Sequence, residues 1–129
     1  MARRIIDTPD APNSRTRGTP LFSQAVVAAG LVFVAGTSPL DPDGKVVGET
    51  IQEQTAQALR NISTVLAAAG SSLEKVVSAT VILRDAADFA GLNEEWRRWF
   101  PVDPPARQGA KHHLDRPDVR VSIAVIAEA

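Results

Sequence analysis

The sequence contains no cysteine among its 129 residues. The chain therefore has no disulfide bond, no thiolate nucleophile, no zinc–thiolate site and no iron–sulfur cluster. This absence fits a reducing compartment. A basic excess is missing too, because 14 basic residues face 15 acidic ones and the formal net charge is −1. A dedicated nucleic-acid binder usually carries a strong positive charge, so we expect no nucleic acid as a partner.

Long apolar runs are also missing, since no stretch approaches the roughly 20 apolar residues of a membrane span. Residues 1–7 carry charges without a following apolar segment, unlike a secretory signal, and Asp7 and Asp10 argue against an organelle transit peptide. We therefore expect no membrane partner and a cytoplasmic location. What remains, 44% hydrophobic and 22% charged residues, suits one folded domain over residues 1–129.

The hydrophobic periodicity predicts an α+β fold with the element order ββαβαββ. Apolar runs over 24–29 and 31–35, separated by Gly30, predict a hairpin. Thr50 and Glu53 form a capping-box pair before helical apolar spacing that continues to Ala69, and Gly70 suits a left-handed helix end. The other predicted elements are a strand over 76–83, a helix between Asp85 and Pro101 with Phe89, Leu92, Trp96 and Trp99 as its apolar stripe, and strands over 106–113 and 119–127.

Two helices can cover only one face of such a sheet. The opposite face is predicted to carry apolar and small residues, namely Val32, Val34, Ser78, Thr80, Ile82, Ser122, Ala124 and Ile126. A face of this composition is poorly suited to water, and a second copy of the chain is its simplest cover. The alternative is a closed or strongly curled sheet in a monomer.

Several patterns that could carry chemistry have simpler structural explanations. His112 and His113 are adjacent, so on a strand they point to opposite faces and do not easily share a metal ion. We therefore expect no metal site. The glycines form no phosphate-binding motif, and no serine lies in a Gly-x-Ser-x-Gly turn. The two tryptophans of residues 96–99 share the helical stripe while the two arginines between them turn outward, which favours a core stripe over a nucleic-acid patch.

One arginine is placed where it could hold a ligand. Arg107 begins a predicted strand after two prolines, among the small residues Ala106, Gly109 and Ala110. Its guanidinium is a rigid fork that matches a carboxylate. From these residues alone, an ordinary surface ion pair is the better explanation.

A series of short segments carries a resemblance along nearly the whole chain, from about Ile5 to the C-terminus. These segments are Phe22–Ala25, Gly30–Gly36, Pro39–Pro42, Gln54–Asn61, Leu66–Leu73, Asp88–Phe89 with Asn93, Pro105–Arg107 and Val121–Ala127. In their order and spacing they resemble the RidA/YjgF family of small trimeric reactive-intermediate deaminases.

The resemblance implies a chorismate-mutase-like homotrimer, with two helices on one face of each sheet and ligand pockets between subunits. It implies a small carboxylate-bearing metabolite as partner, a 2-imino acid or its enamine tautomer that is hydrolysed to a 2-keto acid and ammonia. It also implies that no cofactor is used. Some members are described as endoribonucleases, but the net charge of −1 and the isolated histidines argue against that activity here.

The resemblance also assigns roles to individual residues. Arg107 matches the arginine that binds the substrate carboxylate, and Asn93 matches an asparagine near the pocket. Gly36 matches a strand glycine that lets the ligand approach the backbone, and Gly109 lies where a backbone group meets the substrate. We expect these four residues at the substrate-binding site.

Other positions depart from the family pattern. Phe22 and Thr37, also expected at the substrate-binding site, replace a tyrosine and a glutamine. Ser122 replaces the glutamate thought to activate the attacking water; a serine is no general base at neutral pH, although it can hold a water molecule. With Arg107 and Ser122 as the catalytic residues, we expect a weak deaminase or one of altered specificity. The alternative is a non-catalytic or different-substrate paralogue that binds a small carboxylate ligand at the trimer interface.

Overall fold

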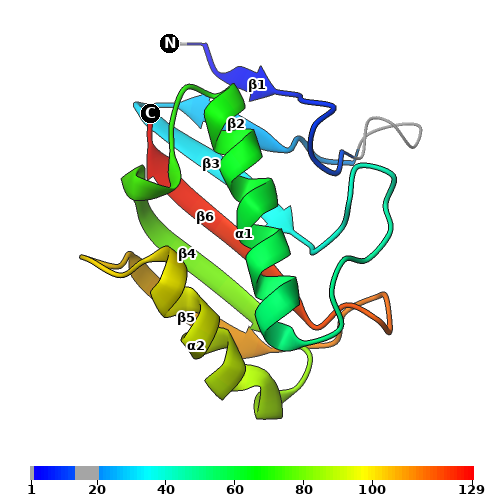
Figure 1. Cartoon of the computed structure of the whole chain (residues 1–129). Helices are drawn as coiled ribbons and strands as arrows, with labels where there is room; N and C mark the ends of the chain where they lie inside the picture. Colours follow the sequence, from blue (N-terminus) through cyan, green and yellow to red (C-terminus); the bar gives the residue numbers. More distant parts are fainter. Residues whose placement is uncertain (1, 14–20) are drawn as a thin grey trace.

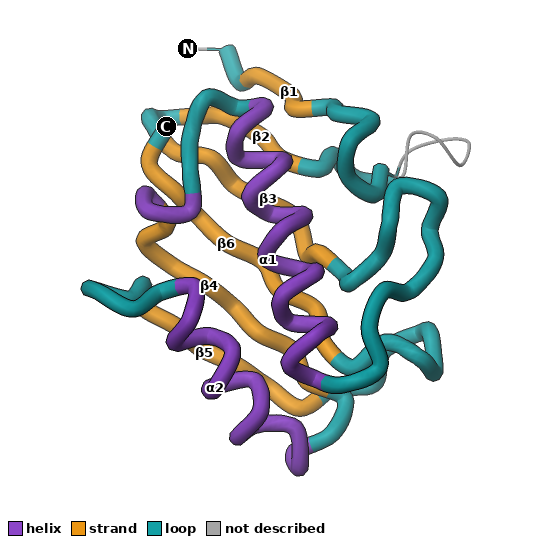
Figure 2. Tube along the Cα trace, viewed as in Figure 1, coloured by secondary structure: helices purple, strands orange, loops and turns teal. Residues whose placement is uncertain are grey.

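Two helices lie side by side on one face of a single six-stranded sheet (Figures 1 and 2). A computed structural model describes residues 2–13 and 21–129. The strand order is β1-β2-β3-β6-β4-β5. The elements are β1 (Arg4–Ile6), β2 (Ala25–Ala28), β3 (Leu31–Thr37), α1 (Ile51–Ala68), β4 (Val76–Leu83), α2 (Phe89–Trp99), β5 (Ala106–Lys111) and β6 (Val121–Glu128). The predicted α+β fold with both helices on one face is confirmed.

The structure adds one strand to the predicted order. β1 pairs antiparallel with β2, from Arg4 opposite Val27 to Ile6 opposite Ala25. Of its three residues only Ile6 is buried, so the sequence offers too short an alternation to reveal a strand. The other pairs are antiparallel except for β4 and β5, which run parallel because α2 crosses between them.

Both ends of α1 follow the local signals in the sequence. At the start, the Thr50 hydroxyl accepts from the Glu53 amide at 3.1 Å, and Glu53 Oε1 accepts from the Thr50 amide at 3.0 Å. The carboxylate of Glu53 accepts hydrogen bonds from the Thr50 amide, the Glu49 amide and the Thr50 hydroxyl, and these lower the pKa of Glu53 below its ordinary value. At the other end, Gly70 has φ +83°, a conformation that favours glycine. The predicted capping box and helix end are therefore confirmed.

The core lies between the helices and the inner face of the sheet. On β6 the residues Val121, Ile123, Val125 and Ala127 are all buried, and the residues between them are partly exposed. This alternation is the period of two that a strand imposes. Leu59, Ile62 and Leu66 of α1 and Leu92 of α2 are almost completely buried above these side chains.

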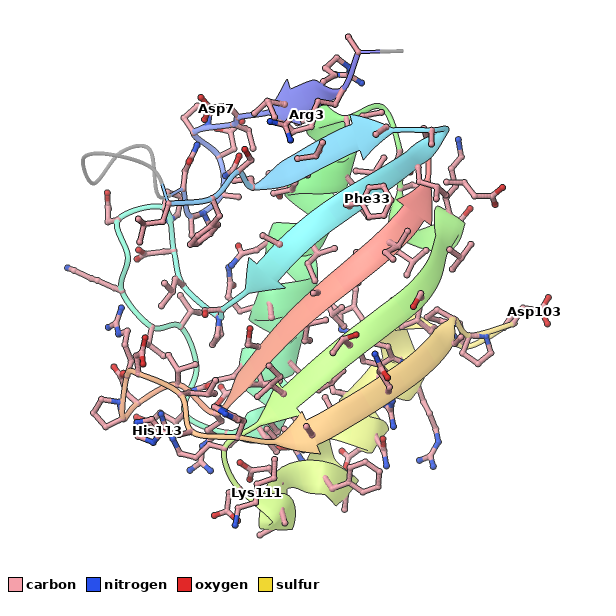
Figure 3. The ribbon with its side chains drawn as sticks, turned by 180° about the vertical axis from the view of Figure 1, so that it is seen from behind. Arg3, Asp7, Phe33, Asp103, Lys111 and His113 are labelled. Carbon is pink, nitrogen blue, oxygen red and sulfur yellow. The ribbon has the colours of Figure 1, made fainter. Side chains whose placement is uncertain are left out.

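Among the described residues, no helix covers the outer face of the sheet (Figure 3). Six of the eight residues predicted for this face are partly exposed, as expected: Ser78, Thr80, Ile82, Ser122, Ala124 and Ile126. The prediction was wrong for Val32 and Val34, which are buried in the core. Phe33 lies between them, pairs with Ile126 and is 41% exposed, because the strand alternation in β3 is shifted by one residue from the expected phase.

Among the described residues, no helix combines the length and the apolar character needed to cross a membrane.

Candidate functional site

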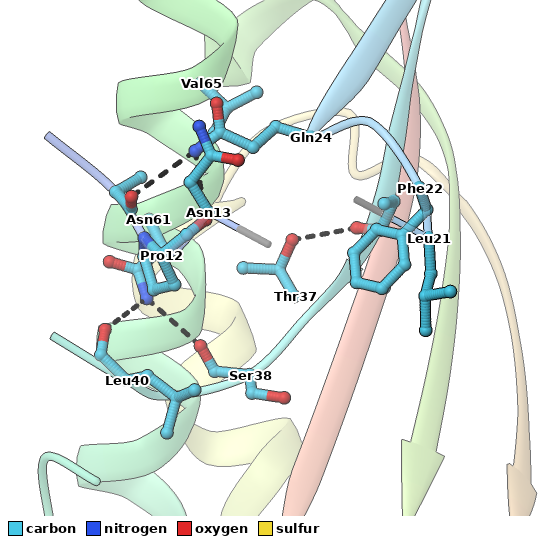
Figure 4. A pocket seen from close by; sticks show the side chains of 13 residues that line it. Pro12, Asn13, Leu21, Phe22, Gln24, Thr37, Ser38, Leu40, Asn61 and Val65 are labelled. Atoms are coloured by element: carbon cyan, nitrogen blue, oxygen red, sulfur yellow. Dashed lines mark hydrogen bonds between the residues drawn. The ribbon is translucent and has the colours of Figure 1, made fainter. Parts of the chain in front are cut away.

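Five of the seven residues predicted for the site line two separate pockets, whereas Asn93 and Ser122 line neither. The first, of about 320 Å³, lies at the end of β3 and is bordered by α1 and by the arm that follows β1 (Figure 4). Phe22, Gly36 and Thr37 line it. The second, of about 550 Å³, lies between the start of α2 and the strands β4 and β5. Arg107 and Gly109 line this second pocket.

Ser122 does not line the first pocket but lies next to Gly36, which does. A Cβ atom placed on Gly36 would lie 3.2 Å from Ser122 Oγ, so any other residue would crowd the serine hydroxyl. Thr37 donates its hydroxyl proton to the Ala35 carbonyl at 2.8 Å, which leaves the hydroxyl oxygen as an acceptor. Phe22 is 56% exposed and presents an apolar ring at the pocket. This part of the site offers hydroxyl groups and an apolar wall.

Arg107 is held by three side chains of α2. Its Nη2 donates to Asn93 Oδ1 at 2.7 Å, and its guanidinium carbon lies 5.1 Å from the Trp96 ring centroid and 5.8 Å from that of Phe89. Both distances are within the range of a cation–π interaction. Among the described residues, no acidic side chain forms an ion pair with Arg107. The surface ion pair considered from the sequence is therefore not formed within the described chain.

The second helix differs in one respect from its predicted stripe. Leu92 and Trp96 are buried as expected, but Phe89 is 54% exposed and borders the second pocket beside Arg107. Residues 86–88 form a separate 3-10 turn that Asp85 caps, so α2 begins only at Phe89. The resulting phase places Phe89, Asn93 and Trp96 against one arginine.

Gly109 keeps β5 close to β4. A Cβ atom at this position would lie 2.9 Å from the Val81 carbonyl oxygen, closer than real side chains approach a backbone atom. Another residue here would push the edge strand away from the sheet and change the floor of the second pocket.

One chain does not bring Arg107 and Ser122 together. Arg107 of β5 pairs with Ala79 of β4, whose side chain is buried under the helices. Ser122 pairs with Ile82, which lies on the outer face. Because neighbouring paired residues share a face, Arg107 lies on the helix side and Ser122 on the bare side. The residues predicted for the site therefore lie on two different faces of the sheet.

Neither pocket is lined by an acidic or histidine side chain of the described residues. The charged residues at the second pocket are Arg107 and Lys111, and the first pocket has none. His112 and His113 are exposed at the end of β5 and line neither pocket. Within residues 2–13 and 21–129, no group of three potential metal ligands is assembled.

Two buried amide side chains of the first pocket were not assigned any role from the sequence. Asn61 of α1 donates to the carbonyl oxygens of Ser38 at 3.0 Å and Leu40 at 2.8 Å, which fixes the loop after β3. Gln24 hydrogen bonds to the arm before β2. Buried amides in otherwise apolar surroundings are the signal that could have found them, but burial is known only from the fold.

The fold and the sequence match known proteins over nearly the whole chain. The profile of the family described as Endoribonuclease L-PSP matches residues 11–129. A RutC family protein of Pyrococcus abyssi is 38% identical over 130 residues, covering 98% of both chains. A goat protein named 2-iminobutanoate/2-iminopropanoate deaminase is 35% identical, covering 98% of this chain and 90% of its own.

Solved structures agree with these relatives. The crystal structure of yeast Mmf1 superimposes with a TM-score of 0.89 at 31% identity, with 98% of each chain covered. The family profile and the structural match thus each extend over most of the chain. The chain therefore belongs to the Endoribonuclease L-PSP family, the RidA/YjgF family that its sequence resembles.

Proposed function

We propose that this protein hydrolyses 2-imino acids, or their enamine tautomers, to 2-oxo acids and ammonia, at a site formed between copies of the chain. The observation that carries this proposal is the exposure of Arg107 and the small number of its partners among the described residues. Its guanidinium is exposed, rests against two aromatic rings and has Asn93 as its one described hydrogen-bond partner. Such a group can bind a carboxylate through two parallel hydrogen bonds. A relative named as an imine deaminase supports the substrate class.

In the proposed reaction, water adds to the imine carbon and a proton moves to the nitrogen. The hydroxyl proton of this adduct then passes to its nitrogen, the carbon–nitrogen bond breaks, ammonia leaves, and the carbonyl of the 2-oxo acid forms. Arg107 holds the carboxylate, while Ser122 Oγ, beside Gly36, positions the water by a hydrogen bond. General acid–base assistance is typically worth 10²–10⁴-fold. Because no acidic or histidine side chain of the described residues lines either pocket, we expect slow turnover.

A homotrimer would bring the two halves of the site together. The half with Gly36 and Ser122 and the half with Arg107 lie on different faces of one sheet. In a cyclic assembly, one surface of each copy contacts a different surface of the next copy, so the two halves can meet at every interface. The same contact would remove from water the outer face that carries Phe33 and Ile126.

The lack of an acid–base group supports a second candidate function. Both pockets could bind a small carboxylate ligand without converting it, because Ser122 alone is no general base at neutral pH. The two candidates differ in one outcome. A binding protein retains affinity for 2-oxo acids but releases no ammonia above the buffer rate.

The test is ammonia release from imino acids that an amino-acid oxidase generates in the assay. We expect the wild type to accelerate release slowly, and Ser122→Glu to raise the rate by up to about 100-fold, because the new carboxylate can polarise the water. Ser63→Glu is the matched control, since it adds the same carboxylate at a partly exposed serine of α1 that lines neither pocket. A wild-type rate equal to that of buffer, with binding intact, would select the second candidate.

A further inference from the structure

Residues 8–13, the arm that follows β1, are fastened to the sheet by one buried side chain. Gln24 lies just before β2 and is only 7% exposed. Its Oε1 accepts from the Thr8 amide at 2.7 Å, and its Nε2 donates to the carbonyl oxygens of Thr8 at 3.0 Å and Pro12 at 2.9 Å. The Ala11 carbonyl lies 3.3 Å from the same nitrogen. The side-chain amide of Gln24 therefore binds backbone groups at both Thr8 and Pro12.

The main chain of Gln24 reaches the opposite wall of the first pocket. Its carbonyl oxygen accepts from the Ala35 amide at 2.9 Å, directly before Gly36. One residue therefore connects the arm with the end of β3, where the proposed site begins. An amide that is buried and fully hydrogen bonded holds its partners firmly, because leaving them unpaired costs the desolvation of each polar group.

The arm supplies part of the apolar lining of the first pocket. Ala11 and Pro12 of the arm belong to this apolar lining, together with Phe22, Leu40 and Val65 from other segments (Figure 4). A ligand whose carboxylate is held elsewhere, at Arg107, would leave its side chain to be received by such a wall.

We propose that Gln24 is a positioning residue that holds residues 8–13 against the end of β3, and that this arm forms the wall that selects the ligand's side chain. The inference rests on the proposed function, because it assumes that the apolar side chain of the 2-oxo or 2-imino acid binds in the first pocket. The side-chain amide of Gln24 is hydrogen bonded to the arm and its carbonyl to β3, so it acts on the ligand through the arm. Replacing Gln24 should therefore change the selectivity for side-chain length and leave the binding of the carboxylate unchanged.

Calorimetric titration with pyruvate, 2-oxobutanoate and 2-oxopentanoate tests the proposal, because the three acids differ only in side-chain length. In the wild type each added methylene should tighten binding about fourfold, the gain expected from burying one CH₂. In Gln24→Glu the carboxylate faces carbonyl oxygens that it cannot donate to, so the arm should separate from the sheet. We expect the fourfold steps to fall to near onefold, with pyruvate affinity changed by less than about twofold.

Gln52→Glu, the same change on α1 outside the first pocket, is the control and should keep the fourfold steps. A second readout is pH. Burial and the surrounding carbonyls raise the pKa of the introduced carboxyl. At mildly acidic pH its proton can be donated again, and part of the selectivity of Gln24→Glu should return. Asp7 and Asp10 are the acidic residues in and next to this segment, so the wild type measured over the same pH range is the reference.

Unchanged steps in Gln24→Glu, or equal loss in Gln52→Glu, would overturn the inference while the proposed function stands. Wild-type protein that binds none of the three acids would instead overturn the proposed function, and this inference with it. If Gln24→Glu does not fold, Gln24→Met replaces it, since methionine is similar in length and uncharged. It also lacks the amide, so it must flatten the series as well.

Discussion

The two faces of β6 differ in what covers them. Ile123 faces the helices and is fully buried, whereas Ile126, three residues later on the same strand, remains partly exposed on the outer face. The inner face is covered by elements of the same chain, and the outer face has no cover among the described residues. The difference shows that one strand serves two purposes, the folding of the chain and, as proposed, its assembly.

The two halves of the proposed site follow the same division. Arg107 is positioned from the helix side, by Asn93, Phe89 and Trp96 of α2. Ser122 lies on the outer face, beside Gly36. A stable fold therefore does not by itself give a complete site, and a mutation can disturb one without the other.

The largest expected effect separates the two isoleucines of β6. Ile123→Ala should lower the free energy of unfolding by about 2–5 kcal/mol, because it leaves a cavity between the sheet and the helices. Ile126→Ala should cost less than about 1 kcal/mol in the folding of the single chain, since its site is already partly open to water. Urea denaturation at concentrations that dissociate the assembly measures both. Equal losses would mean that the outer face belongs to the core of the chain.

The next effect concerns assembly. Ala124→Asp puts a charge at the centre of the outer face, where burial against another copy would leave it unpaired. Sedimentation should show about three times the chain mass of 13.7 kDa for the wild type and a single chain for the variant. Ala90→Asp, on the exposed side of α2, is the control and should assemble normally. A wild type that sediments as a monomer would contradict the proposed trimer.

A smaller effect is expected at Arg107. Arg107→Lys keeps the charge but loses the planar fork, and pyruvate affinity should fall about tenfold, or roughly 1.4 kcal/mol. The melting temperature should change by no more than about 2 °C, because the side chain is exposed. Arg97→Lys makes the same change at an exposed position of α2 and should leave binding intact. Equal affinity in all three proteins would remove Arg107 from the site.

The smallest expected effect is on stability, at the start of α1, which takes no part in the outer face. Thr50→Ala removes the N-cap and should cost about 1 kcal/mol. Glu53 has a lowered pKa in the folded chain, so its contribution is present above the unfolded-state pKa and is lost as pH falls through the folded-state value. The stability difference between wild type and Glu53→Gln should therefore shrink as pH falls below about 4.5. A difference that is constant down to pH 3 would contradict the capping role.

Local signals made the helices predictable from the sequence. The Thr50–Glu53 pair and Gly70 mark the ends of α1 because capping depends on residues a few positions apart. The phase of β3 was predicted wrongly, because Leu31, Val32, Phe33 and Val34 are all apolar and offer no polar residue to mark the outer face. The position of Phe89 beside Arg107 was missed for a similar reason, since an apolar residue at helical spacing is expected in the core.

By itself the sequence determined the α+β class, the order of most elements, the resemblance to one family and the residues that could hold a carboxylate. Only the tertiary structure showed that Arg107 and Ser122 lie on different faces of the sheet, and that Gln24 fastens the arm to the wall of the first pocket. Helix capping and hydrophobic periodicity depend on residues a few positions apart, so they can be recognised in the sequence itself. The face of a strand and the partner of a buried amide depend on strand register and on contacts between segments far apart in the chain.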